Sequence, residues 1–257
     1  MSDADGPRLA VQLYTLRELV ATDPDRALDA VVAAGYDSVE LFGPVELLTA
    51  LGDRLRPRGL SAPSLHARLV GTDPVPVFEA ARSIGAGYVI DPRVDVARWG
   101  GRDDILRIAD DLNELSVRAQ AWDLAVGYHN HDVELAVTVD GEPALSVLAA
   151  ALEPGVVLEL DVYWAAIGGA DVPRLLDDLG PRVRLLHVKD APRLGDGSLD
   201  RERRHQVPFG SGALPAPEIL RAAAATEILV TEFDDYDGDL GEAIRIARDR
   251  LQDLARR

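Results

Sequence analysis

Eight short apolar runs recur along the chain, each followed by an amphipathic segment, and this rhythm constrains the fold more than any other feature. The first run covers residues 9–13 and the seventh covers residues 183–188. One repeat takes roughly thirty residues, the length of a strand with its return helix. Asp23 and Pro24 form a helix start signal after the first run, and Gly35 forms a stop signal. We therefore predict a single (β/α)8 TIM barrel over residues 1–257.

A doubly wound open sheet is the alternative fold. Such sheets bind dinucleotides through a glycine-rich turn after the first strand, but Gln12, Leu13 and Tyr14 stand there instead. The least regular stretch, residues 191–214, follows the seventh run. Because long irregular insertions at this place are commonly functional, we expect a long loop or lid beside the mouth of the barrel.

Composition limits the partners and the compartment. Forty-four acidic residues against 27 basic ones give a formal net charge of −17, which repels nucleic-acid backbones and anionic membranes. The chain has no cysteine, so thiolate metal sites are excluded. Residues 1–7 are acidic and lack an apolar stretch, so we expect a cytoplasmic protein. No nucleic-acid or membrane partner is expected, and a homo-oligomer is left open.

Side chains able to bind a metal stand where the apolar runs end. His66, His129 and His187 each end a run, and so do Asp161 and Glu232. Strand ends of a barrel converge on one mouth, and a buried carboxylate needs a cation or another partner. Taken singly, Asp161 could cap the next helix and Glu232 could form a salt bridge. Together they predict one divalent ion, Mn²⁺, Mg²⁺, Co²⁺ or Zn²⁺, and several carboxylates with one imidazole favour Mn²⁺.

Lys189 is the only lysine in the chain, and it follows His187 closely. An ammonium can give up its proton in a suitable site, whereas a guanidinium cannot. A sequence that otherwise uses arginine therefore predicts a catalytic role for Lys189. The alternative is a residue on a solvated loop.

Six motifs carry a family resemblance. They are residues 12–17 (QLYTLR), 35–40 (GYDSVE), 128–134 (YHNHDVE), 160–164 (LDVYW), 187–190 (HVKD), and Glu232 with its acidic tail. Together they resemble the sugar phosphate isomerase/epimerase family, which has the xylose isomerase-like barrel and also contains inosose dehydratases and the endonuclease IV branch. The resemblance spans nearly the whole chain.

The resemblance implies a metal held by Glu, Asp, His and Glu from the fifth to eighth strands. Asp161, His187 and Glu232 match the last three of these ligands. The first glutamate is replaced around Gly127. We expect Glu134 to supply the missing carboxylate, with the His129 imidazole as the alternative.

The resemblance also implies a metal-dependent isomerase or epimerase that removes a proton next to the carbonyl of a sugar or keto-sugar. Family epimerases use two glutamates, and only Glu232 is in its expected place. His129, His131 and Lys189 are then the candidates for the second acid/base. A dehydratase or lyase of a keto-sugar or inosose is the alternative, and a non-catalytic sugar-binding barrel or subunit is the alternative from another class. The net charge argues against phosphodiester cleavage.

A small-molecule carbohydrate substrate would need a shaped pocket. Trp164 offers an apolar face for a sugar ring, and Arg193 offers a fork of donors for oxygens. The residues predicted to contact substrate are Tyr14, Glu40, His66, Trp164 and Arg193.

Overall fold

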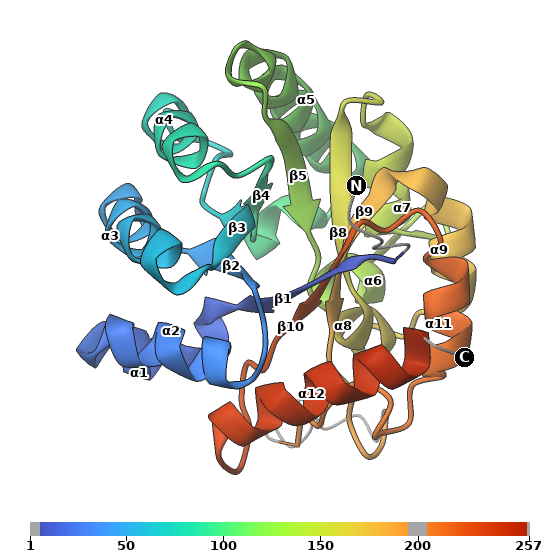
Figure 1. Cartoon of the computed structure of the whole chain (residues 1–257). Coiled ribbons are helices and arrows are strands. Elements are labelled where there is room, and N and C mark those ends of the chain that lie inside the picture. The colour runs from blue at the N-terminus through green and yellow to red at the C-terminus, as the bar shows by residue number, and fades with distance from the viewer. Residues whose placement is uncertain (1–5, 195–204, 256–257) are drawn as a thin grey trace.

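Eight parallel strands close into a barrel with helices around it (Figure 1). The computed structural model describes residues 6–194 and 205–255. The barrel strands are β1 (Arg8–Gln12), β2 (Ser38–Phe42), β3 (Ser61–His66), β4 (Tyr88–Asp91), β5 (Ala125–His129), β8 (Val156–Asp161), β9 (Val183–Val188) and β10 (Ile228–Thr231). They follow chain order around the ring, and β1 closes it by pairing with both β2 and β10. The predicted (β/α)8 barrel is confirmed.

Helices connect successive strands on the outside of the barrel. They are α1 (Arg17–Thr22), α2 (Pro24–Ala33), α3 (Val45–Leu55), α4 (Val75–Ile84), α5 (Arg102–Ala119), α7 (Ala144–Ala151), α9 (Val172–Leu179), α11 (Ala216–Ala222) and α12 (Leu240–Ala255). The short helices α6 (Val133–Ala136) and α8 (Val162–Ile167) follow β5 and β8, and a small hairpin of β6 (Thr138–Val139) and β7 (Glu142–Pro143) precedes α7. Within the described ranges, none of the helices is long and apolar enough to cross a membrane.

Local signals set the bounds of α2 as the sequence predicts. Asp23 Oδ1 accepts a hydrogen bond from the Arg26 backbone N–H at 3.0 Å, and Pro24 occupies the first helical position. The chain then leaves the helix through Gly35 at φ +88°, a left-handed conformation that a side chain disfavours.

The barrel interior changes from apolar to polar along β9. Alternate strand residues face the same side of a sheet, so Leu185, His187 and Lys189 all point inward from β9 and the residue that comes after it. Leu185 packs in a small apolar cluster with Ala10 and Val230. His187 and Lys189 are fully buried above it, toward the C-terminal ends of the strands. The period of the strand therefore puts ionisable groups in one enclosed space.

Asp190 holds the described end of the predicted loop 191–214 against the barrel. Its Oδ1 accepts from the backbone N–H of Ala191 at 2.8 Å and of Leu214 at 3.0 Å. Its Oδ2 accepts from the backbone N–H of Gly210 at 3.2 Å and of Gly212 at 3.0 Å. The rest of the predicted lid, residues 195–204, lies outside the described residues.

Replacing Asp190 by alanine is expected to destabilise the fold by about 3 kcal/mol, because several backbone donors lose a charged acceptor. Urea unfolding followed by circular dichroism measures the change. Asp237→Ala, at an exposed position, is the control and should leave the midpoint unchanged. Equal midpoints for the two variants would contradict an anchoring role for Asp190.

Candidate functional site

Four side chains at the C-terminal ends of neighbouring strands form a buried cluster of donor atoms. They are His129, Asp161, His187 and Glu232, and one donor atom of each lies within 4.8 Å of the others. His187 Nδ1 lies 3.0 Å from Glu232 Oε2 and 4.0 Å from Asp161 Oδ2, and His129 Nε2 lies 3.9 Å from Asp161 Oδ2. Ligands bound at about 2.0–2.2 Å stand roughly 3–4 Å apart, so this set fits one divalent cation.

Packing on β5 explains why the cluster receives an imidazole from position 129. Gly127 faces the same side of the strand two residues earlier. A Cβ atom there would lie 2.6 Å from Ile90 Cδ1 and 2.8 Å from Val157 Cγ2. Because those side chains fill the space above Gly127, a longer side chain enters the cluster only from His129.

Glu134, which we expected to supply the first carboxylate, lies outside the cluster. It is buried, and both of its oxygens are engaged elsewhere. Oε1 accepts from Tyr128 Oη at 2.6 Å, and Oε2 accepts from the His131 backbone N–H at 2.9 Å. The structure thus brings His129, rather than Glu134, together with Asp161 and Glu232.

Lys189 is enclosed by three carboxylates. Its Nζ lies 2.8 Å from Asp161 Oδ2, 2.5 Å from Glu232 Oε2 and 2.7 Å from Asp234 Oδ2, and the side chain is fully buried. Burial alone would lower the pKa of Lys189, but these carboxylates outweigh burial and raise it well above its usual value. The alternative of a solvated loop is wrong, because Lys189 is fully buried. The surrounding carboxylates oppose the release of a proton that was expected from the sequence.

The pKa values of the side chains in the cluster are shifted in different directions. Burial, with the neighbouring His187 ring, lowers the pKa of His129 well below its usual value, so this imidazole is neutral and keeps a lone pair. Burial opposes charge on Glu232 as well, but Lys189 and His187 lower its pKa well below the usual range. Burial raises the pKa of Asp161 to about 6. A neutral imidazole beside carboxylates is the donor chemistry that a divalent metal requires.

Asp161 also caps the helix that follows it, which was the alternative interpretation of this residue. Its Oδ1 accepts from the Trp164 backbone N–H at 2.9 Å and so caps α8, while Oδ2 faces Lys189. Capping and cluster formation use different oxygens of the same carboxylate. The two interpretations of Asp161 are therefore compatible.

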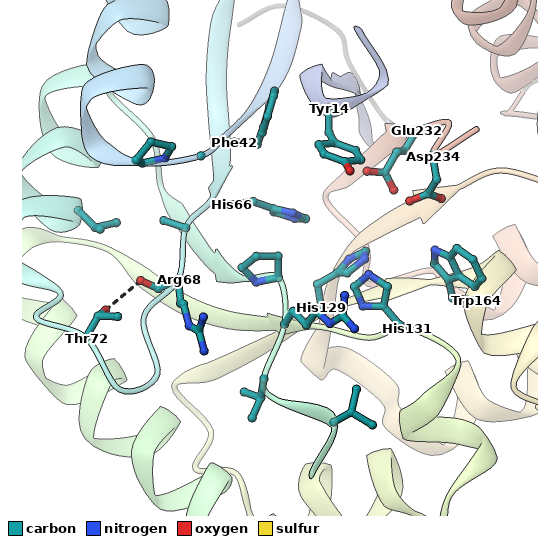
Figure 2. Close-up of a pocket in the computed structure, with 18 of the residues that line it drawn as sticks. Tyr14, Phe42, His66, Arg68, Thr72, His129, His131, Trp164, Glu232 and Asp234 are labelled. Atoms are coloured by element: carbon teal, nitrogen blue, oxygen red, sulfur yellow. Dashed lines mark hydrogen bonds between the residues drawn. The ribbon is translucent and has the colours of Figure 1, made fainter. Parts of the chain in front are cut away.

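A pocket of about 1230 Å³ adjoins the cluster, and His129 and Glu232 belong to its wall. Figure 2 shows His66, His129 and His131 facing the same space as Glu232, with Tyr14 and Trp164 near Glu232 and Asp234. Of the side chains predicted to contact substrate, the pocket is lined by Tyr14, His66 and Trp164. The predicted acid/base His131 lines it as well. The ends of strands far apart in sequence thus form one pocket.

Two predicted substrate contacts are not part of this pocket. Glu40 is fully buried beneath it, where its Oε1 accepts from Gln12 Nε2 at 2.8 Å. Arg193 is exposed and does not line the pocket wall. Glu40 faces the barrel interior because it lies on β2, and Arg193 lies in an irregular segment whose direction no strand period fixes.

Sequence reasoning missed several residues of the site. Asp234 is the third carboxylate around Lys189, and Glu159 lies beneath the cluster in contact with His129. Asp234 stands two residues after Glu232, and Glu159 stands two residues before Asp161. The two-residue strand period was the signal that could have identified Glu159, whereas Asp234 comes after β10 in an irregular stretch.

Comparison with known proteins shows which family and fold the chain shares. The sequence profile described as "Xylose isomerase-like TIM barrel" matches residues 28–254. The comparison with curated proteins finds no match. Among solved structures, a sugar phosphate isomerase/epimerase from Parabacteroides distasonis ATCC 8503 has 22% identity and a TM-score of 0.76, covering 98% of this chain and 96% of that chain.

Two further structures share the fold. The IOLI protein, solved with a binding zinc atom, has 18% identity and a TM-score of 0.69 over 96% of this chain and 97% of that chain. The probable 3-DHS dehydratase AsbF from Bacillus anthracis has 14% identity and a TM-score of 0.71 over 95% and 98%. The profile match covers most of the sequence, and the chain belongs to the xylose isomerase-like TIM barrel family.

Proposed function

We propose that the protein is a divalent-metal-dependent isomerase or epimerase of a sugar or keto-sugar, which removes a proton from the carbon next to a carbonyl. The observation that carries this proposal is the buried cluster of His129, Asp161, His187 and Glu232. Two of its members, His129 and Glu232, also line a pocket large enough for a small carbohydrate.

His129, Asp161, His187 and Glu232 would hold the metal, which when bound would polarise the carbonyl and a neighbouring hydroxyl as a Lewis acid. Two imidazoles with two carboxylates suit Zn²⁺ or Co²⁺ as well as Mn²⁺. A single imidazole would have favoured Mn²⁺, and the second imidazole removes that preference. The zinc atom of the IOLI structure supports Zn²⁺ as a candidate alongside Mn²⁺.

Glu232 is the base in this proposal. Lys189 and His187 keep its carboxylate ionised, and the side chain reaches the pocket wall. An ionised carboxylate at this place can accept the proton from the substrate carbon. It can return the proton to a neighbouring carbon, which gives isomerisation.

His131 is the partner acid/base in this proposal. The other two candidates are engaged, because His129 Nδ1 lies 3.0 Å from Glu159 and Lys189 is held as an ammonium. His131 lines the pocket, and its Nδ1 is buried with no hydrogen-bond partner among the described residues. Burial lowers the pKa of His131 to about 4, so its ring is neutral near pH 7.

A dehydratase or lyase is the second candidate. Glu232 and His131 are chemically different, one a carboxylate and the other an imidazole. In an elimination Glu232 would take the proton, and the neutral His131 ring would donate a hydrogen bond to the leaving hydroxyl group. Both candidates therefore begin with the same proton abstraction and differ in the second step.

Incubation of metal-loaded protein with ketoses and keto-cyclitols in deuterated water tests both candidates. We expect deuterium at a carbon next to the carbonyl of one substrate, detected by NMR. Inversion at that carbon identifies an epimerase, transfer to the neighbouring carbon an isomerase, and loss of water a dehydratase. A folded protein that binds no metal and exchanges no deuterium would instead be a non-catalytic barrel.

A further inference from the structure

A second set of polar side chains lies inside the barrel, beneath the four-residue cluster. We call it the inner layer, and it consists of Glu40, His66 and Glu159. Glu40 and Glu159 are fully buried, and His66 is 7% exposed. Charged groups this deep need partners, because burial of an unpaired carboxylate is costly.

Imidazole nitrogens converge on one oxygen of each carboxylate in the inner layer. Glu159 Oε2 lies 2.5 Å from His66 Nε2, 3.0 Å from His129 Nδ1 and 3.2 Å from His187 Nε2. Glu40 Oε1 lies 2.7 Å from His187 Nε2 and 3.1 Å from His66 Nε2. The His66 and His187 rings are stacked, with an interplanar angle of 6°.

These contacts determine which ring nitrogens carry hydrogen. An ionised carboxylate only accepts hydrogen bonds, so each imidazole nitrogen that faces it must donate. His129 then carries its hydrogen on Nδ1, and His187 carries one on Nε2. The opposite nitrogen of His129, Nε2, faces Asp161 Oδ2 at 3.9 Å. His187 Nδ1 lies 3.0 Å from the ionised Glu232, so both nitrogens of His187 donate.

We infer that Glu159 is a positioning residue that fixes the tautomer of His129. The His129 imidazole then presents its Nε2 lone pair to the cation, so this inference rests on the proposed metal site. Carboxylates behind a metal-binding histidine orient the ring and make it a better donor. The same oxygen, Glu159 Oε2, also accepts from His66 and His187.

A second cation within the inner layer is the competing interpretation. One donor atom each of His66, His129, Glu159 and His187 lie within 4.8 Å of one another. Glu40 Oε2 and Glu159 Oε1 are buried and lack a hydrogen-bond partner among the described residues. However, 2.5 Å between His66 Nε2 and Glu159 Oε2 is a hydrogen-bond distance, shorter than the roughly 3 Å between two ligands of one metal.

Glu159→Gln tests the inference, because it removes the charge and keeps the shape. We expect E159Q to bind Zn²⁺ about 10- to 100-fold more weakly than wild type in a competition titration with a chelator. Glu134→Gln is the matched control. It alters another buried carboxylate near β5 that contacts none of the three rings, so Zn²⁺ affinity should not change.

The tautomers can be read directly in wild type, even if E159Q folds poorly. Long-range ¹H–¹⁵N NMR of the imidazoles should show hydrogen on His129 Nδ1 and none on His129 Nε2. Hydrogen on His129 Nε2 in place of Nδ1 would overturn the inference. So would equal Zn²⁺ affinity in E159Q and wild type, while the proposed function stood.

Metal stoichiometry separates the remaining outcomes. Two Zn²⁺ per wild-type chain and one in E159Q would make the inner layer a second metal site and overturn the positioning role. No Zn²⁺ binding in wild type would overturn the proposed function itself. One Zn²⁺ per chain, weakened in E159Q alone, supports both.

Discussion

Glu232→Gln is expected to lower divalent-metal affinity by at least about 100-fold and turnover by about 10⁴-fold, the largest catalytic effect of any substitution in the chain. Glu232 belongs to the four-residue cluster and lines the pocket beside it. The glutamine amide cannot ionise, so the substitution removes one metal ligand and the proposed base at the same time. Metal content after gel filtration and deuterium exchange into substrate measure the two losses separately.

Asp235→Asn provides the control for Glu232→Gln. Asp235 lines the same pocket but is exposed and is not part of the four-residue cluster. The control should keep both its metal and its exchange activity. Full metal content in E232Q would show that Glu232 is not a ligand, and full exchange would show that another group takes the proton.

The barrel and most of the four-residue cluster were predictable because both result from regular patterns. Repeated strands and helices set the ring, and closure of the ring brings strand ends together. Asp161, His187 and Glu232 each come at the end of an apolar run, so the sequence was enough to predict that they lie close together. The choice between His129 and Glu134 depended on packing around Gly127, which the sequence does not show.

Glu159 was the one residue of the inner layer that was open to prediction but was missed, since Glu40 and His66 had been predicted as substrate contacts. Glu159 lies within an apolar run, and the strand period puts it on the same face as Asp161. The position of Arg193 was beyond prediction, because an irregular segment has no period to orient its side chains. The surroundings of Lys189 were predictable only in part. The period of β9 sets the inward direction of its side chain, whereas its partner Asp234 comes after the last strand in an irregular stretch.

Lys189→Met is expected to destabilise the metal-free protein by about 3–5 kcal/mol, the largest loss of stability among these predictions. The change removes the ammonium and keeps a side chain of similar length. Asp161, Glu232 and Asp234, whose oxygens lie 2.5 to 2.8 Å from Nζ, would then be left without their buried cation. Urea unfolding in the presence of a chelator measures the loss.

A divalent cation should restore much of that stability to K189M, because it neutralises the Asp161 and Glu232 oxygens that the ammonium had paired. Ligand binding to the native state adds about 2.7 kcal/mol at a concentration 100-fold above Kd. The ammonium in wild type lies against two of the proposed ligands, so K189M should bind the metal at least as tightly as wild type.

Arg245→Met, which breaks exposed ion pairs with Glu242 and Asp249, should show neither effect. Loss of metal binding in K189M would mean that Lys189 is needed to assemble the cation site, and that its charge does not compete with the cation.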